Sequence, residues 1–241
     1  MEAWVVDVAG HYNFYGALSV LIAMVLVTKV GKFIIFKVPA LARMKKINEK
    51  EDGEKFKQEK YRPIVKKNDL VGFVCNLVLF LLVLPFVISG EPVPVWKVLL
   101  DAFIILMFYD FFYYLIHRFW FHGKGAMRRI HALHHQARKP TYIDAYYVHP
   151  LETVVGLALL MLSVSFLAVV LGQFHVATIV VMYVLYIQLN TINHTFIDLP
   201  YFPFKTLNWI AKKHHIHHEN MQKGNYASLA MVYDKIFGTL D

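Results

Sequence analysis

The feature that most constrains this chain is a series of five long apolar runs. They occupy residues 14–28, 70–88, 97–116, 151–171 and 177–192. A helix needs about 20 mostly apolar residues to cross a bilayer, and each run approaches that length, the first and last with the help of tilt or snorkelling lysines. Only 17% of the 241 residues are charged, against about 25% in an ordinary soluble domain. The sequence therefore predicts an all-α integral membrane helical bundle with about five membrane segments.

The basic residues indicate how this bundle is oriented. If all five runs span, 24 of the 25 Lys and Arg residues fall on one side and only Lys97 on the other. Because short cytoplasmic loops accumulate Lys and Arg, we expect an outside N-terminus and a cytoplasmic C-terminus. Anionic lipid headgroups explain the net charge of +8, so no nucleic-acid partner is expected. Glu2 and Asp7 also argue against a cleavable signal peptide.

Histidine is the residue type that points to chemistry. The chain has 13 histidines, and 11 of them fall on the predicted cytoplasmic side. The single cysteine, Cys75, excludes a disulfide framework, a Cys-based zinc site and an iron–sulfur cluster of the chain's own. Neutral imidazole is the commonest metal ligand in proteins. The composition therefore favours a His-rich metal site at the cytoplasmic ends of the membrane helices.

Two motifs, HALHH and HHIHH, repeat one histidine spacing. Their histidines are His131, His134 and His135, and His214, His217 and His218. Positions i, i+3 and i+4 share one face of a helix. Three stacked imidazoles pack poorly and would repel one another as cations, whereas a bound metal ion keeps them neutral. Two such triplets on one side of the membrane predict metal ligation.

Three further histidines complete the predicted set. His117 and His122 follow the third run in HRFWFH and diverge by about 140° on a regular helix, so they would serve two metals, or one metal if the helix breaks there. His194 lies one turn after Asn190 at the inner end of the fifth run. Two ions with four or five ligands each need about nine or ten donors. The nine histidines supply these, with Asn190 as a weak or water-mediated tenth.

These motifs resemble those of the fatty acid hydroxylase and sterol desaturase superfamily of membrane di-iron oxygenases. The resemblance is carried by HRFWFH, HALHH, HPLE and HHIHH and by the ending NYASLAMVYDKIFGTLD, from about residue 110 to residue 241. The HPLE stretch, residues 149–152, is most similar to the sterol C-4 methyl oxidase branch. The resemblance implies metal ligation by the nine histidines named above. Where some members of the family place a histidine, this sequence has Asn190.

The resemblance implies an enzyme that uses two iron ions and O2 to hydroxylate, desaturate or oxidatively demethylate a lipid of sterol or fatty acyl type. Cleaving an unactivated C–H bond requires an oxidant made from O2 at a redox-active metal. The sequence has no GxGxxG, CxxC or HPGG segment. We therefore expect an external electron carrier, which could be a reductase, a cytochrome, a ferredoxin or a rubredoxin.

The chain is expected to divide into two parts. Residues 1–69 would form the N-terminal membrane helix and a basic cytoplasmic connection, of which residues 44–69 are interpreted as solvated or lying in the interface. Residues 70–241 would form a catalytic membrane domain like that of the fatty acid hydroxylases.

Several polar residues are candidates for orienting the ligands without binding metal themselves. They are Asp110, His149, Asn190, His215 and Glu219, with Asp144 and Glu152 as further carboxylates. In all-His sites, carboxylates orient imidazole N–H groups from outside. Asp110 lies two turns before His117, about 10 Å away along the helix, so it would orient a different ligand or make a polar contact between helices.

Two other classes of protein remain open. A metal-ion transporter also concentrates histidine, but it would place ligands near the bilayer midplane along a path. A membrane haem protein would need axial histidine pairs facing each other within the helices. A Soret band would indicate haem, and metal flux in sealed vesicles without O2 consumption would indicate transport.

Overall fold

The computed structural model of the chain describes residues 11–241, so the expectation drawn from Glu2 and Asp7 lies outside the described residues. Within this part, five helices are long and apolar enough to cross a membrane. They are Phe14–Ile35, Tyr61–Val87, Val95–Phe121, Pro150–Leu171 and Val176–His194. The predicted all-α membrane bundle is confirmed, and each predicted run lies in one of these helices or ends one residue beyond it. The second helix begins nine residues before the predicted start at residue 70.

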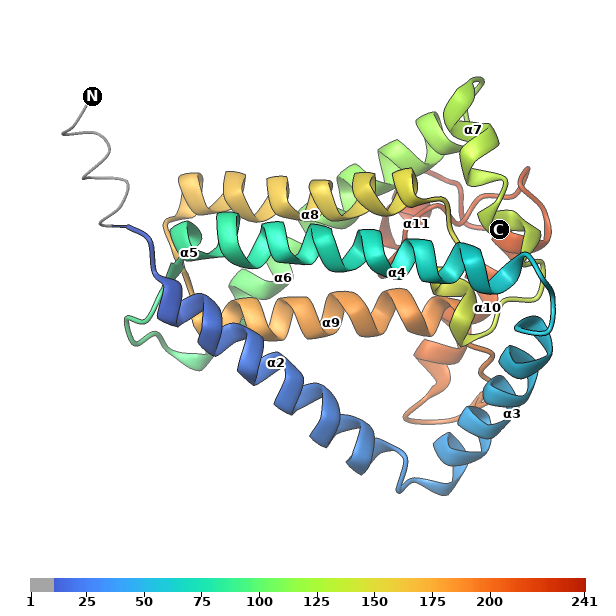
Figure 1. Ribbon diagram of the computed structural model, residues 1–241, viewed down its shortest axis with the longest axis horizontal. Helices are drawn as coiled ribbons and strands as arrows, with labels where there is room; N and C mark the ends of the chain where they lie inside the picture. Colours follow the sequence, from blue (N-terminus) through green and yellow to red (C-terminus); the bar gives the residue numbers. More distant parts are fainter. Residues whose placement is uncertain (1–10) are drawn as a thin grey trace.

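The bundle is built from helices that run side by side (Figure 1). They are α4 (Tyr61–Val78), α6 (Val95–Leu115), α8 (Pro150–Leu171) and α9 (Val176–His194). Helix α8 packs against α4 and α6, and α9 packs against α6. Helix α2 (Phe14–Ile35) packs against α9 and then diverges from the bundle toward α3 (Figure 1). Helices α4 and α9 face each other across the bundle interior, where the hydroxyl of Tyr183 donates a hydrogen bond to the side chain of Asn76.

One end of the bundle is closed by short irregular elements. Helix α4 continues through the π-helical turn η1 (Leu79–Val83) into α5 (Leu84–Val87). The two-residue strands β1 (Ile88–Ser89) and β2 (Phe174–His175) then pair in parallel. They are the only strands in residues 11–241. This pairing ties the α5 end to the connection between α8 and α9.

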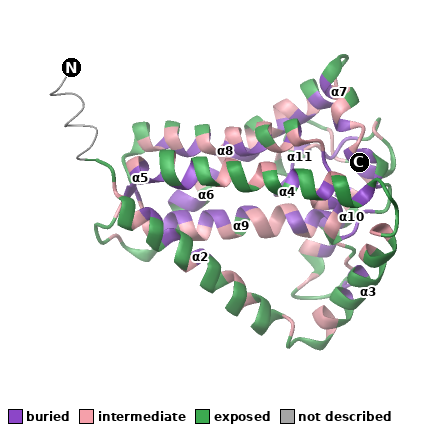
Figure 2. Cartoon of the chain, viewed as in Figure 1, coloured by how far each residue is buried: buried purple, intermediate pink, exposed green. Residues whose placement is uncertain are grey.

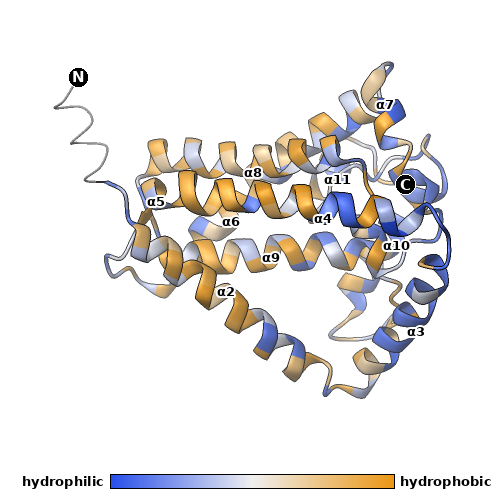
Figure 3. Ribbon diagram, in the orientation of Figure 1, coloured by the Kyte–Doolittle hydropathy of each residue, from blue (hydrophilic) through white to orange (hydrophobic). Residues whose placement is uncertain are grey.

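The surface of the bundle is that of a membrane protein. The outer faces of the membrane helices are exposed and apolar, and hydrophilic residues collect at the end formed by α3 and α10 (Figures 2 and 3). Val169 and Trp96, for example, are 86% and 65% exposed. An apolar surface of this extent is stable only against another apolar medium, which for helices of this length is lipid.

Residues 44–69, predicted as a solvated or interface-lying connection, are mostly helical and packed against the bundle. Helix α3 (Pro39–Lys55) begins with a proline at its first position, where the missing N–H costs nothing. The buried Asn48 side chain exchanges hydrogen bonds with the backbone N–H and C=O of Phe196, both at 2.9 Å. Helix α4 runs without interruption through the boundary expected after residue 69.

The remaining elements gather at the polar end of the bundle (Figure 1). They are η2 (Ile116–Phe121), α7 (Ala126–His131), η3 (His134–Gln136), η4 (Tyr142–Tyr146), α10 (Lys205–Glu219) and α11 (Val232–Ile236). Their gathering brings segments that are about 100 residues apart in sequence to the same ends of α6, α8 and α9.

Candidate metal centre

The nine histidines expected to be ligands lie together in two groups. Within each group, one ring nitrogen per residue lies within 4.8 Å of the corresponding nitrogen of every other member. The five-His group is His117, His122, His131, His135 and His217, and the four-His group is His134, His194, His214 and His218. All nine are buried except the partly exposed His122. The structure therefore brings together every histidine of the predicted set.

Each triplet is divided between the two groups. In HALHH the i, i+4 pair joins the five-His group, whereas His134 joins the four-His group. In HHIHH the assignment is exchanged, so that the i, i+4 pair joins the four-His group and His217 joins the five-His group. The rings of His135 and His218, one from each group, stack with their centroids 5.0 Å apart. The two groups are therefore neighbours built from shared helices.

A π-helical turn brings His117 and His122 into one group. The N–H of His122 donates to the carbonyl of His117 at 3.0 Å, a bond between residues i and i+5. On an α-helix these side chains would point about 140° apart. The π-turn places them one above the other. Of the two alternatives expected from the sequence, a regular helix and a helix that breaks here, the structure shows a departure from α geometry.

Backbone carbonyls fix the orientation of five of the rings. The Nδ1 contacts are His117 to Tyr226 O (2.6 Å), His217 to Gly224 O (2.7 Å), His194 to Asn190 O (2.9 Å), His122 to Met221 O (3.0 Å) and His134 to Tyr147 O (3.2 Å). A carbonyl only accepts, so Nδ1 carries the proton in each of these rings. The lone pair therefore lies on Nε2, the atom that points into the group.

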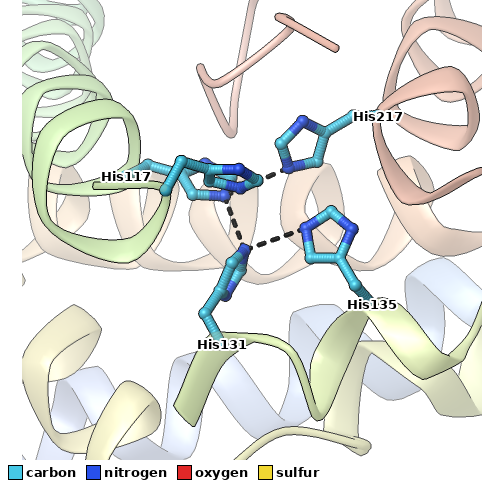
Figure 4. A group of neighbouring side chains, drawn as sticks. His117, His131, His135 and His217 are labelled. Carbon is cyan, nitrogen blue, oxygen red and sulfur yellow. Dashed lines mark hydrogen bonds between the residues drawn. The ribbon is translucent and has the colours of Figure 1, made fainter. Parts of the chain in front are cut away.

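The facing Nε2 atoms fit metal ions (Figure 4). His117 and His217 approach at 3.2 Å, and His134 and His194 at 3.0 Å, each through two lone pairs that would repel without a cation between them. Two nitrogens about 2.1 Å from one ion at a right angle are about 3.0 Å apart. Nε2 of His122 is buried without a hydrogen-bond partner, as expected of a further ligand. An all-imidazole donor set suits Fe, Zn, Cu or Ni.

Burial keeps these imidazoles neutral. Loss of hydration lowers the pKa of His122 and His131 to about 3 and that of His134 to about 4. Neighbouring histidines add to the lowering at His122 and His134. At neutral pH the ligand nitrogens therefore already carry the lone pairs that a metal ion requires.

Glu152 is the carboxylate that reaches one of the nine histidines. Its Oε1 lies 2.9 Å from Nδ1 of His131, and both side chains are buried. The oxygen lies off the direction of the N–H bond, since Nδ1 has no aligned hydrogen-bond partner. The contact therefore places a buried carboxyl group beside a ring of the five-His group without an aligned hydrogen bond.

The other carboxylates have different roles. Asp110 accepts hydrogen bonds from the backbone N–H groups of Ser228 (2.9 Å) and Leu229 (3.0 Å), so it holds the C-terminal segment and contacts no imidazole directly. Asp144 pairs with Lys55. Glu219 is exposed at the end of α10. The contact joins α6 to the non-helical segment at Ser228 and Leu229, and not to another membrane helix as expected.

The remaining candidates lie around the groups. His149 caps α8, with its Nδ1 accepting from the N–H of Leu151 at 3.1 Å. Asn190 gives its backbone carbonyl to His194, and its side chain lines a cavity without joining either group. His215 belongs to neither group, and burial lowers its pKa to about 4.

The turn that carries the carbonyls of Gly224 and Tyr226 was not predicted from the sequence. Asn225, between them, adopts a left-handed φ of 64°, and its side chain bonds the backbone of Lys213 and Asp241. A Cβ on Gly224 would lie 1.8 Å from the carbonyl oxygen of Thr239, so only glycine fits. The one sequence signal of this turn is the pair Asn225 and Tyr226 in NYASLAMVYDKIFGTLD, to which no function was assigned from the sequence.

A cavity of about 400 Å³ extends from the histidines between the membrane helices. His117, His131, His134, His194 and His214 line one end of it. Residues of α4, α6, α8 and α9 line the rest, together with Ala145, Tyr146, Val148 and Ser228. Phe73 of α4 lines the cavity and is also 59% exposed. The cavity therefore reaches the lipid-facing side of the bundle.

These features define an integral membrane protein with a buried nine-histidine centre, able to hold metal ions, at the end of a cavity among its membrane helices. Comparison with protein families matches residues 102–239 to the fatty acid hydroxylase model. The chain belongs to the fatty acid hydroxylase family. This confirms the resemblance carried by the histidine motifs.

The chain is similar to several curated proteins. It is 33% identical to methylsterol monooxygenase 1 of Gallus gallus over 153 residues, which cover 62% of this chain and 49% of that protein. It is 37% identical to methylsterol monooxygenase 1 of Rattus norvegicus over 136 residues, 54% of this chain and 43% of the relative. It is 30% identical to the very-long-chain aldehyde decarbonylase GL1-11 of Oryza sativa subsp. indica over 166 residues, 63% of this chain and 56% of the relative.

The chain thus spans about half the length of the curated relatives that it matches. The methylsterol monooxygenases agree with the branch that the HPLE stretch resembles. No solved structure matches the chain.

Proposed function

We propose that this protein is an O2-dependent membrane oxidoreductase that oxidises a lipid at a pair of iron ions. The observation that carries the proposal is the position of the nine-histidine centre at the inner end of a cavity that reaches the lipid-facing side of α4. A lipid can enter such a cavity without leaving the bilayer. The similarity to methylsterol monooxygenases and to an aldehyde decarbonylase favours a sterol or fatty acyl substrate.

The proposed ligands are the nine histidines, with five at one ion and four at the other. Four ligands leave an ion room for O2 or substrate. When bound, a redox-active metal pair supplies the O2 activation that cleavage of an unactivated C–H bond requires. Iron is favoured over the other metals because the family is one of iron oxygenases and because zinc has no redox chemistry.

The residues of this chain prepare the site. Carbonyls of Tyr226, Gly224 and Met221 hold three rings of the five-His group in one tautomer, and the carboxyl group of Glu152 lies beside His131, where it would carry a negative charge next to a bound cation. Because these partners are part of the folded backbone, the ligand nitrogens converge before a metal arrives. The cavity walls combine the rings of Tyr109, Tyr183 and Tyr186 with polar side chains such as Asn76 and Asn190, and they would bring a lipid carbon to the histidines.

We further propose that residues 70–241 form the catalytic unit and that residues 1–69 support it. Helix α2 packs against α9, and Lys55 of α3 bonds Asp144, so the first part braces the second. The distribution of Lys and Arg favours a cytoplasmic position for the histidines and the C-terminus. Electrons would come from a separate carrier protein on that side.

The alternatives are less consistent with the geometry. A transporter would distribute ligands along a path through the membrane, whereas all nine histidines lie at one end of the bundle. Two axial nitrogens on opposite sides of a haem iron are about 4 Å apart, twice a metal–nitrogen bond of about 2.0 Å. Here His117 and His217 approach at 3.2 Å and His134 and His194 at 3.0 Å, and further imidazoles of each group crowd around them, so neither pair could hold a porphyrin between its rings.

The proposal is tested by comparing the lipids of cells with and without the gene. We expect a product heavier by one oxygen or lighter by two hydrogens, and about two iron ions per purified chain. An unchanged lipid profile in cells that express and metallate the protein would contradict the proposed activity. A Soret band would identify a haem protein instead.

A further inference from the structure

A second hollow reaches the histidines at the polar end of the bundle. Its volume is about 570 Å³. It is lined by Lys60, Ala132, His135, Gln136, Arg138, His218, Glu219, Asn220 and Met221. A smaller hollow of about 190 Å³ shares Lys60, Gln136 and Arg138 with it and adds Lys55 and Lys139. We call the two together the basic groove.

The basic groove meets one histidine from each group. His135 belongs to the five-His group and His218 to the four-His group, and neither lines the cavity between the membrane helices. Nδ1 of each ring is buried without a hydrogen-bond partner. A molecule in the groove would therefore stand next to both groups, through the two rings that stack on each other. Electron tunnelling weakens steeply with distance, so a carrier in the groove would stand close to both candidate ions.

The rim of the groove is positively charged. Lys60, Arg138 and Lys139 are exposed, while the charge of Lys55 is balanced by the buried Asp144. Among the residues that line the two hollows, Glu219 is the only exposed acid. Three exposed cations around a hollow attract a partner that presents carboxylates and accelerate its encounter with the protein.

The geometry points to the basic groove as the docking site of an acidic one-electron carrier protein, an inference that rests on the proposed function. Each hydroxylation of a lipid RH would take up one O2, two electrons and two protons and give ROH and one water. The carrier would deliver the two electrons in two separate encounters. Lipid and carrier would then use opposite accesses, the membrane cavity for one and the basic groove for the other.

The first experiment needs no metal. Metal-free protein in nanodiscs is mixed with an acidic [2Fe–2S] ferredoxin, treated with a carbodiimide that joins amines to carboxylates, and mapped by mass spectrometry. We expect cross-links at Lys60 and Lys139. Lys46, exposed on α3 and outside the groove, is the matched control and should not react. Equal cross-linking at Lys46 would overturn the placement.

The second experiment measures the electron transfer. Iron-loaded protein is reduced by the same ferredoxin in a stopped-flow instrument at low and high salt. The double variant Lys60→Glu with Arg138→Glu should slow the second-order reduction at least tenfold at low salt, and the difference should shrink as salt screens the charges. Lys46→Glu should stay within twofold of the wild type. Dithionite, which does not need the groove, should reduce all three proteins alike.

The outcomes separate this inference from the proposed function. A double variant that ferredoxin reduces at the wild-type rate overturns the docking site while leaving the enzyme proposal intact. Wild-type protein that binds no iron, or whose iron dithionite does not reduce, overturns both. If the double variant loses binding to vesicles with anionic lipid while its reduction rate is unchanged, the groove binds a headgroup and the docking inference is wrong.

Discussion

Removing Glu152 should weaken one of the two metal sites and spare the other. The carboxylate lies 2.9 Å from Nδ1 of His131, a member of the five-His group, and the side chains of Glu152 and His131 are both buried. A negative charge at this distance stabilises the ring when it binds a cation, and the low local dielectric preserves the effect. Loss of such an outer partner lowers metal affinity by about 10- to 100-fold, or about 1.4 to 2.8 kcal/mol.

Two substitutions separate the charge from the shape. Glu152→Gln keeps an oxygen near the ring without the charge and should lie near the lower end of that range. Glu152→Leu removes both, leaves Nδ1 of His131 without a neighbouring acceptor, and should lie near the upper end. Glu219→Gln and Glu219→Leu are the matched controls, because Glu219 is exposed and contacts no ligand.

The assay is a Co²⁺ titration of metal-free protein, followed by visible absorption in competition with a chelator. The wild type should show two sites, and the Glu152 variants should weaken one of them only. The Glu219 controls should stay within twofold of the wild type. Equal weakening of both sites, or equal effects of Glu152→Leu and Glu219→Leu, would refute the role assigned to the buried carboxylate.

Three further outcomes follow from the same geometry. His134→Ala and His217→Ala should each abolish product and lower the metal content from about two ions to about one, with membrane insertion intact, because the two residues belong to different groups; full turnover in either variant would contradict ligation. Metal-free protein should lose stability as pH falls below 6.5, because histidines in the unfolded chain then bind protons, whereas His131 (folded pKa about 3) and His134 (folded pKa about 4) stay neutral in the folded protein. Chemical unfolding at several pH values should show that the free energy of unfolding falls by about 1.4 kcal/mol per pH unit for each such histidine. A flat profile would count against buried neutral rings. Gly156→Ala should be tolerated, since its Cβ would lie 3.8 Å from the nearest atom, whereas Gly156→Leu should fill the cavity and stop turnover with metal content unchanged; normal turnover in the leucine variant would place the substrate elsewhere.

The sequence predicted the membrane helices and the nine clustered histidines because both depend on local pattern. Apolar runs of the right length and imidazoles at helical spacing are visible without tertiary structure. The pairing within the centre was not visible, since it depends on how the helices pack. Neither triplet indicates that His134 turns away from His135 toward another group.

The partners of the rings were harder still to predict. Five of the nine Nδ1 atoms lie against backbone carbonyls, and every residue type has a carbonyl. Among the carboxylates, Asp110 was as good a candidate as Glu152 by sequence, yet Asp110 bonds the backbone of the C-terminal segment. Which carboxylate reaches a ring depends on the register between α6, α8 and α7, and a single sequence does not contain that register.

The π-turn between His117 and His122 has a consequence for how this stretch can vary in length. Removing one residue from positions 118–121 would place the two histidines at i and i+4, about 40° apart on an ordinary α-helix, so both rings would still share one face without the π-turn. The π-turn therefore absorbs one inserted residue in this helix and leaves the two imidazoles on the same side.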